Sequence, residues 1–132
     1  MNYLIRIKSL ALVESIRPLT TLLGLAGAYI GGIVAGAPYF SLPLFLAMIV
    51  VFLIGAGSMP FNDYFDHEID KISHPERPIP SKRLKPTDAL YFSVVLFSVG
   101  LTISFFINIL CFSIVLFSLV FLYPAQDLIV YQ

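Results

Sequence analysis

The chain contains two long stretches without a single charged side chain, and these restrict its possible folds more than any other feature. No Asp, Glu, Lys, Arg or His occurs from Pro18 to Asn62, or from Ala89 to Gln126. A helix that crosses a bilayer needs roughly 20 apolar residues, so each stretch is long enough for two spans joined by a turn. The sequence therefore predicts an all-α integral membrane protein, a helical bundle with about four transmembrane helices.

Turn-forming residues divide each stretch in two. Gly36 and Pro38 mark a turn in the first stretch, and Asn108 marks one in the second. Pro60 is expected to kink its helix or to start a short new segment, and residues 2–14 to form a short interfacial helix. The transmembrane helices are predicted, within one domain spanning residues 1–132, at about 17–34, 42–64, 88–107 and 109–123.

All eight basic residues lie outside the two apolar stretches. Three precede the first stretch and five lie between the two: Arg6, Lys8, Arg17, Lys71, Arg77, Lys82, Arg83 and Lys85. If each stretch is a helical hairpin, every one falls on the same membrane face, which the positive-inside rule makes cytoplasmic. The sequence thus predicts a multi-pass protein of the cell membrane, with its N-terminus and the loop of residues 65–87 in the cytoplasm. The formal net charge of zero gives no indication of a nucleic-acid partner.

Three aspartates, Asp63, Asp66 and Asp70, follow directly on the first apolar stretch. Their spacing of three and four residues puts them on one stripe of a helix, where like charges repel unless something compensates them. Mg²⁺ does so with oxygen ligands, completing its shell with water and phosphate oxygens. One interfacial acid alone would most simply be solvated, but a set of ionisable groups at membrane depth is costly and usually functional. We therefore predict all three as Mg²⁺ ligands and catalytic carboxylates.

The loop that follows is rich in proline and in cations. Arginine matches phosphate oxygens with two parallel hydrogen bonds, and lysine supplies a point charge. For Arg77 and Lys82, diphosphate binding and a topology-setting attraction to anionic lipid are equally good interpretations, whereas Lys71 and Lys85 are assigned the topological role. Glu68 falls off the aspartate stripe and is expected to be solvated.

These motifs resemble those of a known family. The segment from Asn62 to Asp70 (NDYFDHEID) and the segment from Arg77 to Ser81 (RPIPS) are similar to the first aspartate-rich motif of the UbiA superfamily of intramembrane prenyltransferases, N-D-x-x-D-x-x-x-D followed by R-P-[IL]. The segment from Glu14 to Pro18 (ESIRP) resembles, more weakly, the start of the family's first helix. The resemblance extends from Glu14 to about Phe121, the N-terminal portion of such an enzyme.

The resemblance implies a partial UbiA-type fold and a Mg²⁺-dependent transfer of a prenyl group from an allylic diphosphate to a lipid-soluble or phosphoglyceryl acceptor. It implies that Asn62, together with the three aspartates, binds diphosphate and Mg²⁺, and that Arg77 lies in a loop over the site. The motifs look most like those of archaeal digeranylgeranylglyceryl phosphate synthases, which add a geranylgeranyl group to geranylgeranylglyceryl phosphate in ether-lipid biosynthesis. Quinone-type and chlorophyll-type members of the family are the alternatives.

The sequence departs from the family pattern at two places. The family commonly has Gly after R-P-I-P-S, where this chain has Lys82, and this difference is expected to change the loop geometry without changing the metal site. The family's second aspartate-rich motif has no match here, and residues 124–132, with the lone acid Asp127, do not look like the family's continuation. A truncated or frameshifted product, or a fragment, would explain this.

Two interpretations from other classes compete with the enzymatic one. A small divalent-cation transport or scaffold subunit would use the same carboxylates without chemistry, but transporters place ionisable groups near the bilayer midplane, where both stretches have only Ser and Thr as polar groups. A purely structural pair of helical hairpins would bind no prenyl diphosphate at all.

Because the second motif is missing, we expect the isolated chain to have little or no prenyltransferase activity. The measurement is turnover of an allylic diphosphate by the purified 132-residue protein in the presence of Mg²⁺. Robust turnover would contradict this expectation.

Overall fold

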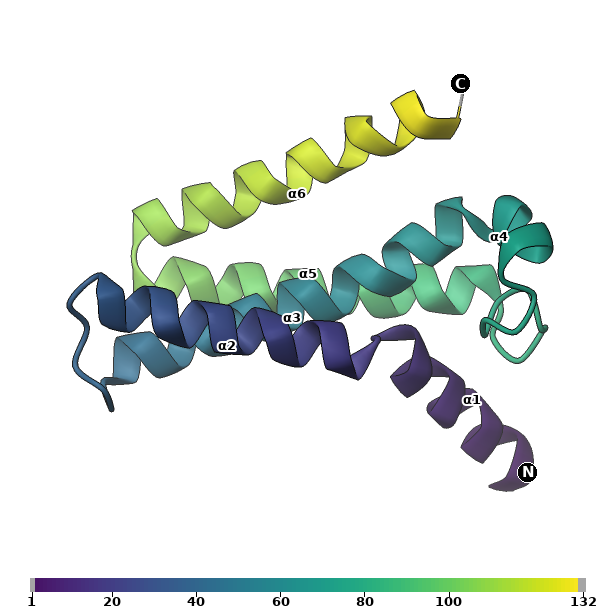
Figure 1. Ribbon diagram of the computed structural model, residues 1–132, viewed down its shortest axis with the longest axis horizontal. Coiled ribbons are helices and arrows are strands. Elements are labelled where there is room, and N and C mark those ends of the chain that lie inside the picture. The colour runs from purple at the N-terminus through teal and green to yellow at the C-terminus, as the bar shows by residue number, and fades with distance from the viewer. Residues whose placement is uncertain (1, 131–132) are drawn as a thin grey trace.

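The computed structural model describes the backbone of residues 2–130, and the side chains within that range except those at positions 2, 4 and 122–130. The Asp127 side chain therefore lies outside the described residues. Within this part of the chain the regular elements are all helices, which confirms the predicted all-α class (Figure 1). The helices are α1 (Asn2–Ser15), α2 (Pro18–Val34), α3 (Leu42–Phe65), α4 (His67–Ser73), α5 (Pro86–Ile107) and α6 (Ile109–Val130).

Two of these helices, α3 and α5, are long and apolar enough to cross a membrane by themselves. The pair α1 and α2 meets the same criterion together from Ile5 to Val34, with a bend of 45° at the break between them. The described apolar part of α6, Ile109–Phe121, is shorter. The described residues thus include helices with the length and composition of membrane spans, whereas the total of four spans stays a prediction.

The most extensive contact between two of the described helices is that of α3 and α5, which lie side by side (Figure 1). Glycines make it possible: a Cβ on Gly57 would lie 2.8 Å from a ring carbon of Phe97, and one on Gly100 would lie 2.8 Å from Cδ1 of Ile54. Ser93 of α5 is fully buried and bonds its hydroxyl to the carbonyl of Ala89 in its own helix at 3.0 Å. Small residues therefore let the two helices come together without leaving a polar group unsatisfied.

The other helices are arranged around this pair. α2 packs against α3, and α6 turns back after Asn108 to contact α5. Figure 1 shows α2, α3 and α5 running alongside one another, with α6 diverging from them towards its C-terminal end. Pro60 is buried inside α3, which continues to Phe65. No new segment begins at Pro60, and the chain breaks instead at Asp66, between α3 and α4.

The charged residues gather at one end of the bundle, where α1, α4, the 74–85 loop and the start of α5 meet. Lys8 of α1 forms an ion pair with Asp88 of α5, with 2.7 Å between Nζ and Oδ2. Beneath it lies a small apolar core of buried residues from α1, the loop and α5: Ala11, Ile79, Leu84 and Ala89. This core fixes the loop against α1 and so sets the position of the residues that the loop carries.

We predict that Gly57→Ala lowers the free energy of unfolding by about 1–3 kcal/mol, because the new methyl group would overlap the Phe97 ring. The matched control is Gly55→Ala on the same helix, where a Cβ meets nothing within 4 Å. The control should be neutral or slightly stabilising, because Ala favours helix over Gly. The measurement is thermal unfolding in detergent followed by circular dichroism, and equal effects of the two substitutions would contradict the close α3–α5 contact.

Candidate active site

Two of the three predicted aspartates are buried at the charged end of the bundle. Asp63 lies in the last turns of α3 and Asp70 lies in α4, and each is only 4% exposed. The chain breaks between them at Asp66, whose φ of −84° and ψ of 1° end one helix and begin the next. The prediction that the three aspartates lie on one stripe of a continuous helix is therefore wrong. The two buried carboxylates are nevertheless brought close together, because both face the same arginine.

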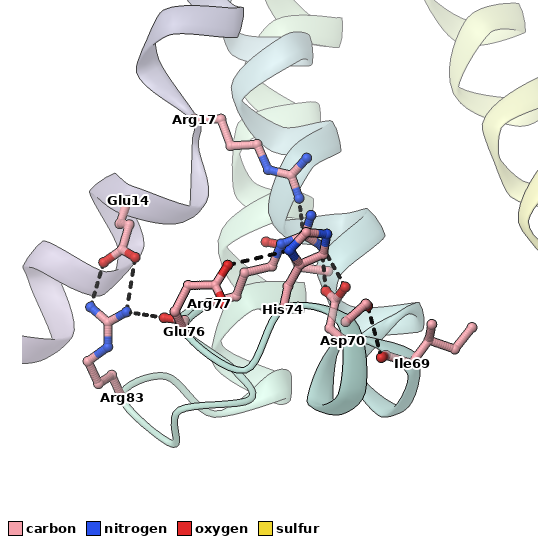
Figure 2. Close-up of polar contacts among 10 residues, drawn as sticks. Glu14, Arg17, Ile69, Asp70, His74, Glu76, Arg77 and Arg83 are labelled. Carbon is pink, nitrogen blue, oxygen red and sulfur yellow. Dashed lines mark hydrogen bonds and ion pairs between the residues drawn. The ribbon is translucent and has the colours of Figure 1, made fainter.

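That arginine is Arg77, from the loop that follows α4. Its Nη1 lies 2.6 Å from each carboxylate oxygen of Asp70 and 3.7 Å from Oδ1 of Asp63. Pro78, directly after it, is buried, and the Arg77 N–H donates to the carbonyl of His74 at 3.1 Å. Figure 2 shows the guanidinium of Arg77 directed at Asp70. The sequence assigned Arg77 to a loop over the site, and the structure places it in contact with two of the site's carboxylates.

A second arginine, Arg17, reaches the same cluster from the bend between α1 and α2. Its Nη2 donates to Oδ1 of Asp63 at 2.7 Å. Arg17 has φ 52° and ψ 70°, the left-handed conformation, which costs a residue with a side chain about 1–2 kcal/mol. Pro18 follows it as the first residue of α2, a position where proline is well tolerated. The bend thus directs the guanidinium of Arg17 towards α3.

The four side chains form an alternating arrangement of charges, with two carboxylates held by two guanidinium groups. Removing an ion from water into a low-dielectric interior costs several kcal/mol, so buried ions persist where they are paired and hydrogen-bonded. The side chains of Arg17 and Arg77 are 38% and 25% exposed, whereas those of Asp63 and Asp70 are 5% exposed. The cluster therefore presents positive groups towards the outside and keeps its carboxylates inside.

The third aspartate, Asp66, stands apart from this ion-pair cluster. It is half-buried at the break between α3 and α4, and no hydrogen bond or ion pair to its carboxylate is found among the described side chains. Its N–H donates to the carbonyl of Asn62 at 2.9 Å, which places Asn62 one turn earlier on α3. Asp66 is thus the carboxylate of the three that is not already neutralised by an arginine.

Lys82, predicted to bind diphosphate, is exposed and makes no contact with the carboxylate cluster in the described residues. Its φ is 61°, in the left-handed region that glycine favours, and its N–H donates to the carbonyl of Ile79 at 3.0 Å. Lys82 thus adopts the backbone conformation that suits the glycine of the family pattern.

Arg83 braces the loop from outside and was missed as a site residue. Its guanidinium donates to both carboxylate oxygens of Glu14 at 2.5 and 2.9 Å and to the carbonyl of Glu76 at 2.6 Å. These bonds, visible in Figure 2, tie the end of α1 to the residue next to Arg77. The hydrogen bond to Glu14 also raises the pKa of Arg83, so the guanidinium of Arg83 stays charged at every ordinary pH.

The donor chemistry of the site fits a hard divalent cation. Carboxylate and amide oxygens are the ligands that Mg²⁺ prefers, and it is usually held by one or two carboxylates with water and phosphate oxygens around it. In the part of the chain that the structure describes, no three His, Cys, Asp or Glu side chains are gathered closely enough to hold a metal. Asp66 with one of the buried aspartates would match the smaller ligand set, and the site of three carboxylates stays a prediction.

The fold and the site together define a class: a multi-pass helical membrane protein with a buried cluster of carboxylates and guanidinium groups at one end of the bundle. The chain belongs to the UbiA prenyltransferase family, which it matches over residues 17–127. This membership confirms the predicted family and favours an enzyme over a cation transport subunit.

Several curated relatives are similar to the chain and share one name, digeranylgeranylglyceryl phosphate synthase. The protein from Methanococcoides burtonii is 47% identical over 98 residues, which cover 71% of this chain and 35% of that protein. The proteins from Sulfolobus acidocaldarius and Thermococcus kodakarensis are 41% and 43% identical over 86% of this chain, and over 41% and 42% of their own lengths. The chain thus spans well under half the length of these relatives. No solved structure matches it significantly.

We predict strong energetic coupling between Asp70 and Arg77. In a double-mutant cycle, Asp70→Asn and Arg77→Gln should show a coupling energy of about 1–3 kcal/mol, because either single change leaves the other charge buried without its partner. The control cycle uses Glu68 and Lys71, which are 2.6 Å apart but exposed, and should show little coupling. The measurement is unfolding in detergent. Equal coupling in the two cycles would contradict the buried pairing.

Proposed function

We propose that this chain carries active-site residues of an enzyme that transfers a geranylgeranyl group from its diphosphate to geranylgeranylglyceryl phosphate, in ether-lipid biosynthesis. The observation that carries the proposal is the buried pair Asp63 and Asp70, held by arginines at the end of an apolar bundle. It is supported by the family membership and by relatives at 41–47% identity that are named for this synthesis.

We propose Mg²⁺ as the cofactor, with Asp66 and the buried aspartates as its ligands. A bound Mg²⁺ would neutralise the negative charge that develops on the diphosphate as it leaves. Asp66 has no counter-charge among the described side chains, so its carboxylate can bind a cation without first breaking an ion pair. Asn62, one turn before it, would add an amide oxygen or a hydrogen-bond donor to the same site.

The two arginines have a role that depends on their pairing. In the absence of substrate their guanidinium groups neutralise Asp63 and Asp70. With a metal-bound diphosphate in the site, Asp63 and Asp70 would hold the metal and the two guanidinium groups would bind phosphate oxygens, which arginine contacts with two parallel hydrogen bonds. Each charged side chain of the cluster would then have an oppositely charged partner both before and after binding. The apolar helices behind the cluster would keep water away from the allylic cation that forms.

The acceptor is proposed from the name that the relatives share, and the orientation from the distribution of basic residues. The name shared by the relatives favours a phosphoglyceryl acceptor over the quinone-type and chlorophyll-type acceptors. The basic residues gather at the end of the bundle that carries the site, so we propose that this end faces the cytoplasm, as the positive-inside rule indicates.

The proposal predicts that the chain has a binding site for geranylgeranyl diphosphate that depends on Mg²⁺. Isothermal titration in an uncharged detergent should show a component of binding that EDTA abolishes. Asp66→Asn should weaken it about tenfold or more, and it breaks no ion pair that would confuse a loss of binding with a loss of folding. Asp63→Asn should weaken binding as well.

The matched control is Glu68→Gln, which removes an exposed carboxylate two residues from Asp66. It should leave binding unchanged. Mg²⁺-dependent binding that is unaltered in the aspartate variants would favour a purely structural role for the carboxylates and would overturn the proposal.

A further inference from the structure

A hollow of about 430 Å³ lies on the loop side of α4, among residues that the proposed reaction does not use. Its polar wall is formed by His67, Glu68 and Lys71 of α4 and by Lys82 and Lys85 of the loop, and its apolar wall includes Ile79 and Leu84. Cavities that bind small ligands commonly have volumes of about 300–1,000 Å³ and a few polar groups on an apolar lining. The hollow has the dimensions and the composition of a small-molecule site.

The charges around the hollow do not balance. Lys71 and Glu68 neutralise each other, with 2.6 Å between Nζ and Oε1, and the hydrogen bond from Lys71 lowers the pKa of Glu68, which keeps that pair ionised. Lys82 and Lys85 have no ion pair among the described side chains. The hollow therefore has an excess of two positive charges beside an apolar wall.

The backbone holds one of these cations at a cost. Lys82 has a φ of 61°, and a residue with a side chain kept in this region costs about 1–3 kcal/mol, a kind of strain that gathers at binding and catalytic sites. The turn is held from both sides, by the bond from the Lys82 N–H to the carbonyl of Ile79 and by the buried Leu84 beyond it. A lysine is thus maintained where the backbone conformation favours glycine.

The hollow and the carboxylate cluster are chemically distinct sites on the two sides of α4. α4 gives Asp70 to the cluster and Lys71 to the hollow. The cluster has no excess charge and needs a metal to hold an anion, whereas the hollow is positive by itself. An anion bound at the hollow should therefore need no divalent cation.

We propose that this hollow is a second anion site, which binds a phosphate monoester without metal through Lys82 and Lys85. A phosphate monoester carries about −1.5 to −2 charges near pH 7, which matches the excess of two positive charges, whereas a phosphodiester carries only one. The apolar wall leaves room for the glyceryl part of such a headgroup. Its assignment to the acceptor substrate rests on the proposed prenyl transfer, but the phosphate binding itself does not.

The test is titration of the full 132-residue chain in an uncharged detergent with inorganic phosphate and with glycerol 1-phosphate, both in EDTA. We expect saturable binding that Lys82→Gln and Lys85→Gln each weaken roughly three- to tenfold and that the double variant abolishes. Lys82→Arg should retain it, because the charge is kept. The matched control is Arg6→Gln, which removes an exposed cation of α1 outside the hollow.

A second measurement separates the two sources of the phosphate. Native mass spectrometry should show that the chain retains phosphatidic acid, a monoester, in preference to phosphatidylglycerol, a diester, if the natural ligand is a lipid headgroup. Saturable binding of glycerol 1-phosphate without this preference would identify a free phosphate instead. Either result supports the site, provided that it depends on Lys82 and Lys85.

Two outcomes would overturn the inference: no saturable phosphate binding in EDTA, or phosphate binding that Arg6→Gln weakens as much as Lys82→Gln does. Loss of phosphate binding in the variant Arg77→Gln, with its fold verified by circular dichroism, would also overturn it, because the arginines paired with Asp63 and Asp70 would then be the anion site. The proposed function is tested separately, by Mg²⁺-dependent diphosphate binding, so each idea can fail while the other stands.

Discussion

The structure depends on how two carboxylates are accommodated at the end of an apolar bundle. Asp63 and Asp70 are almost fully buried, and a buried charge without a partner would cost several kcal/mol. Their partners come from elsewhere in the chain: Arg17 from the bend before α2, and Arg77 from the loop after α4. Satisfying two charges thus ties α3, α4, the loop and the bend before α2 together at this end of the bundle.

This arrangement gives α1 a role beyond lying against the bundle. Arg83 joins Glu14 at the end of α1 to the carbonyl of Glu76, the residue before Arg77. Lys8 and Asp88 join the same helix to the start of α5. Because α1 ends two residues before Arg17, it holds one arginine of the cluster through the chain and the other through the loop. A shift of α1 would therefore move both guanidinium groups together.

The sequence predicted what depends on local pattern and missed what depends on long-range pairing. The charge-free stretches predicted the all-α class, because a bilayer requires long apolar helices. Asn108 predicted the break between α5 and α6, because a turn depends on the residues that form it. The prediction that the three aspartates lie on one continuous helix was wrong at Asp66, because residue spacing alone does not distinguish one helix from two. Arg17 and Arg83 pair with residues 46 and 69 positions away, and no periodicity reports such contacts. The segment ESIRP was the only signal for Arg17, through its resemblance to the family.

The two sides of α4 suggest how one membrane face could serve two anionic substrates. In the proposed reaction both the donor and the acceptor carry phosphate, so a single positive site would bind either one and would be blocked by the wrong one. A neutral cluster of aspartates and arginines has little affinity for a phosphate until a divalent cation accompanies it. A pair of unpaired lysines binds the phosphate monoester directly and has no need of the cation. Specificity then comes from the difference in net charge between the two sites before binding: one is neutral and the other is positive. The helix α4 separates the two sites.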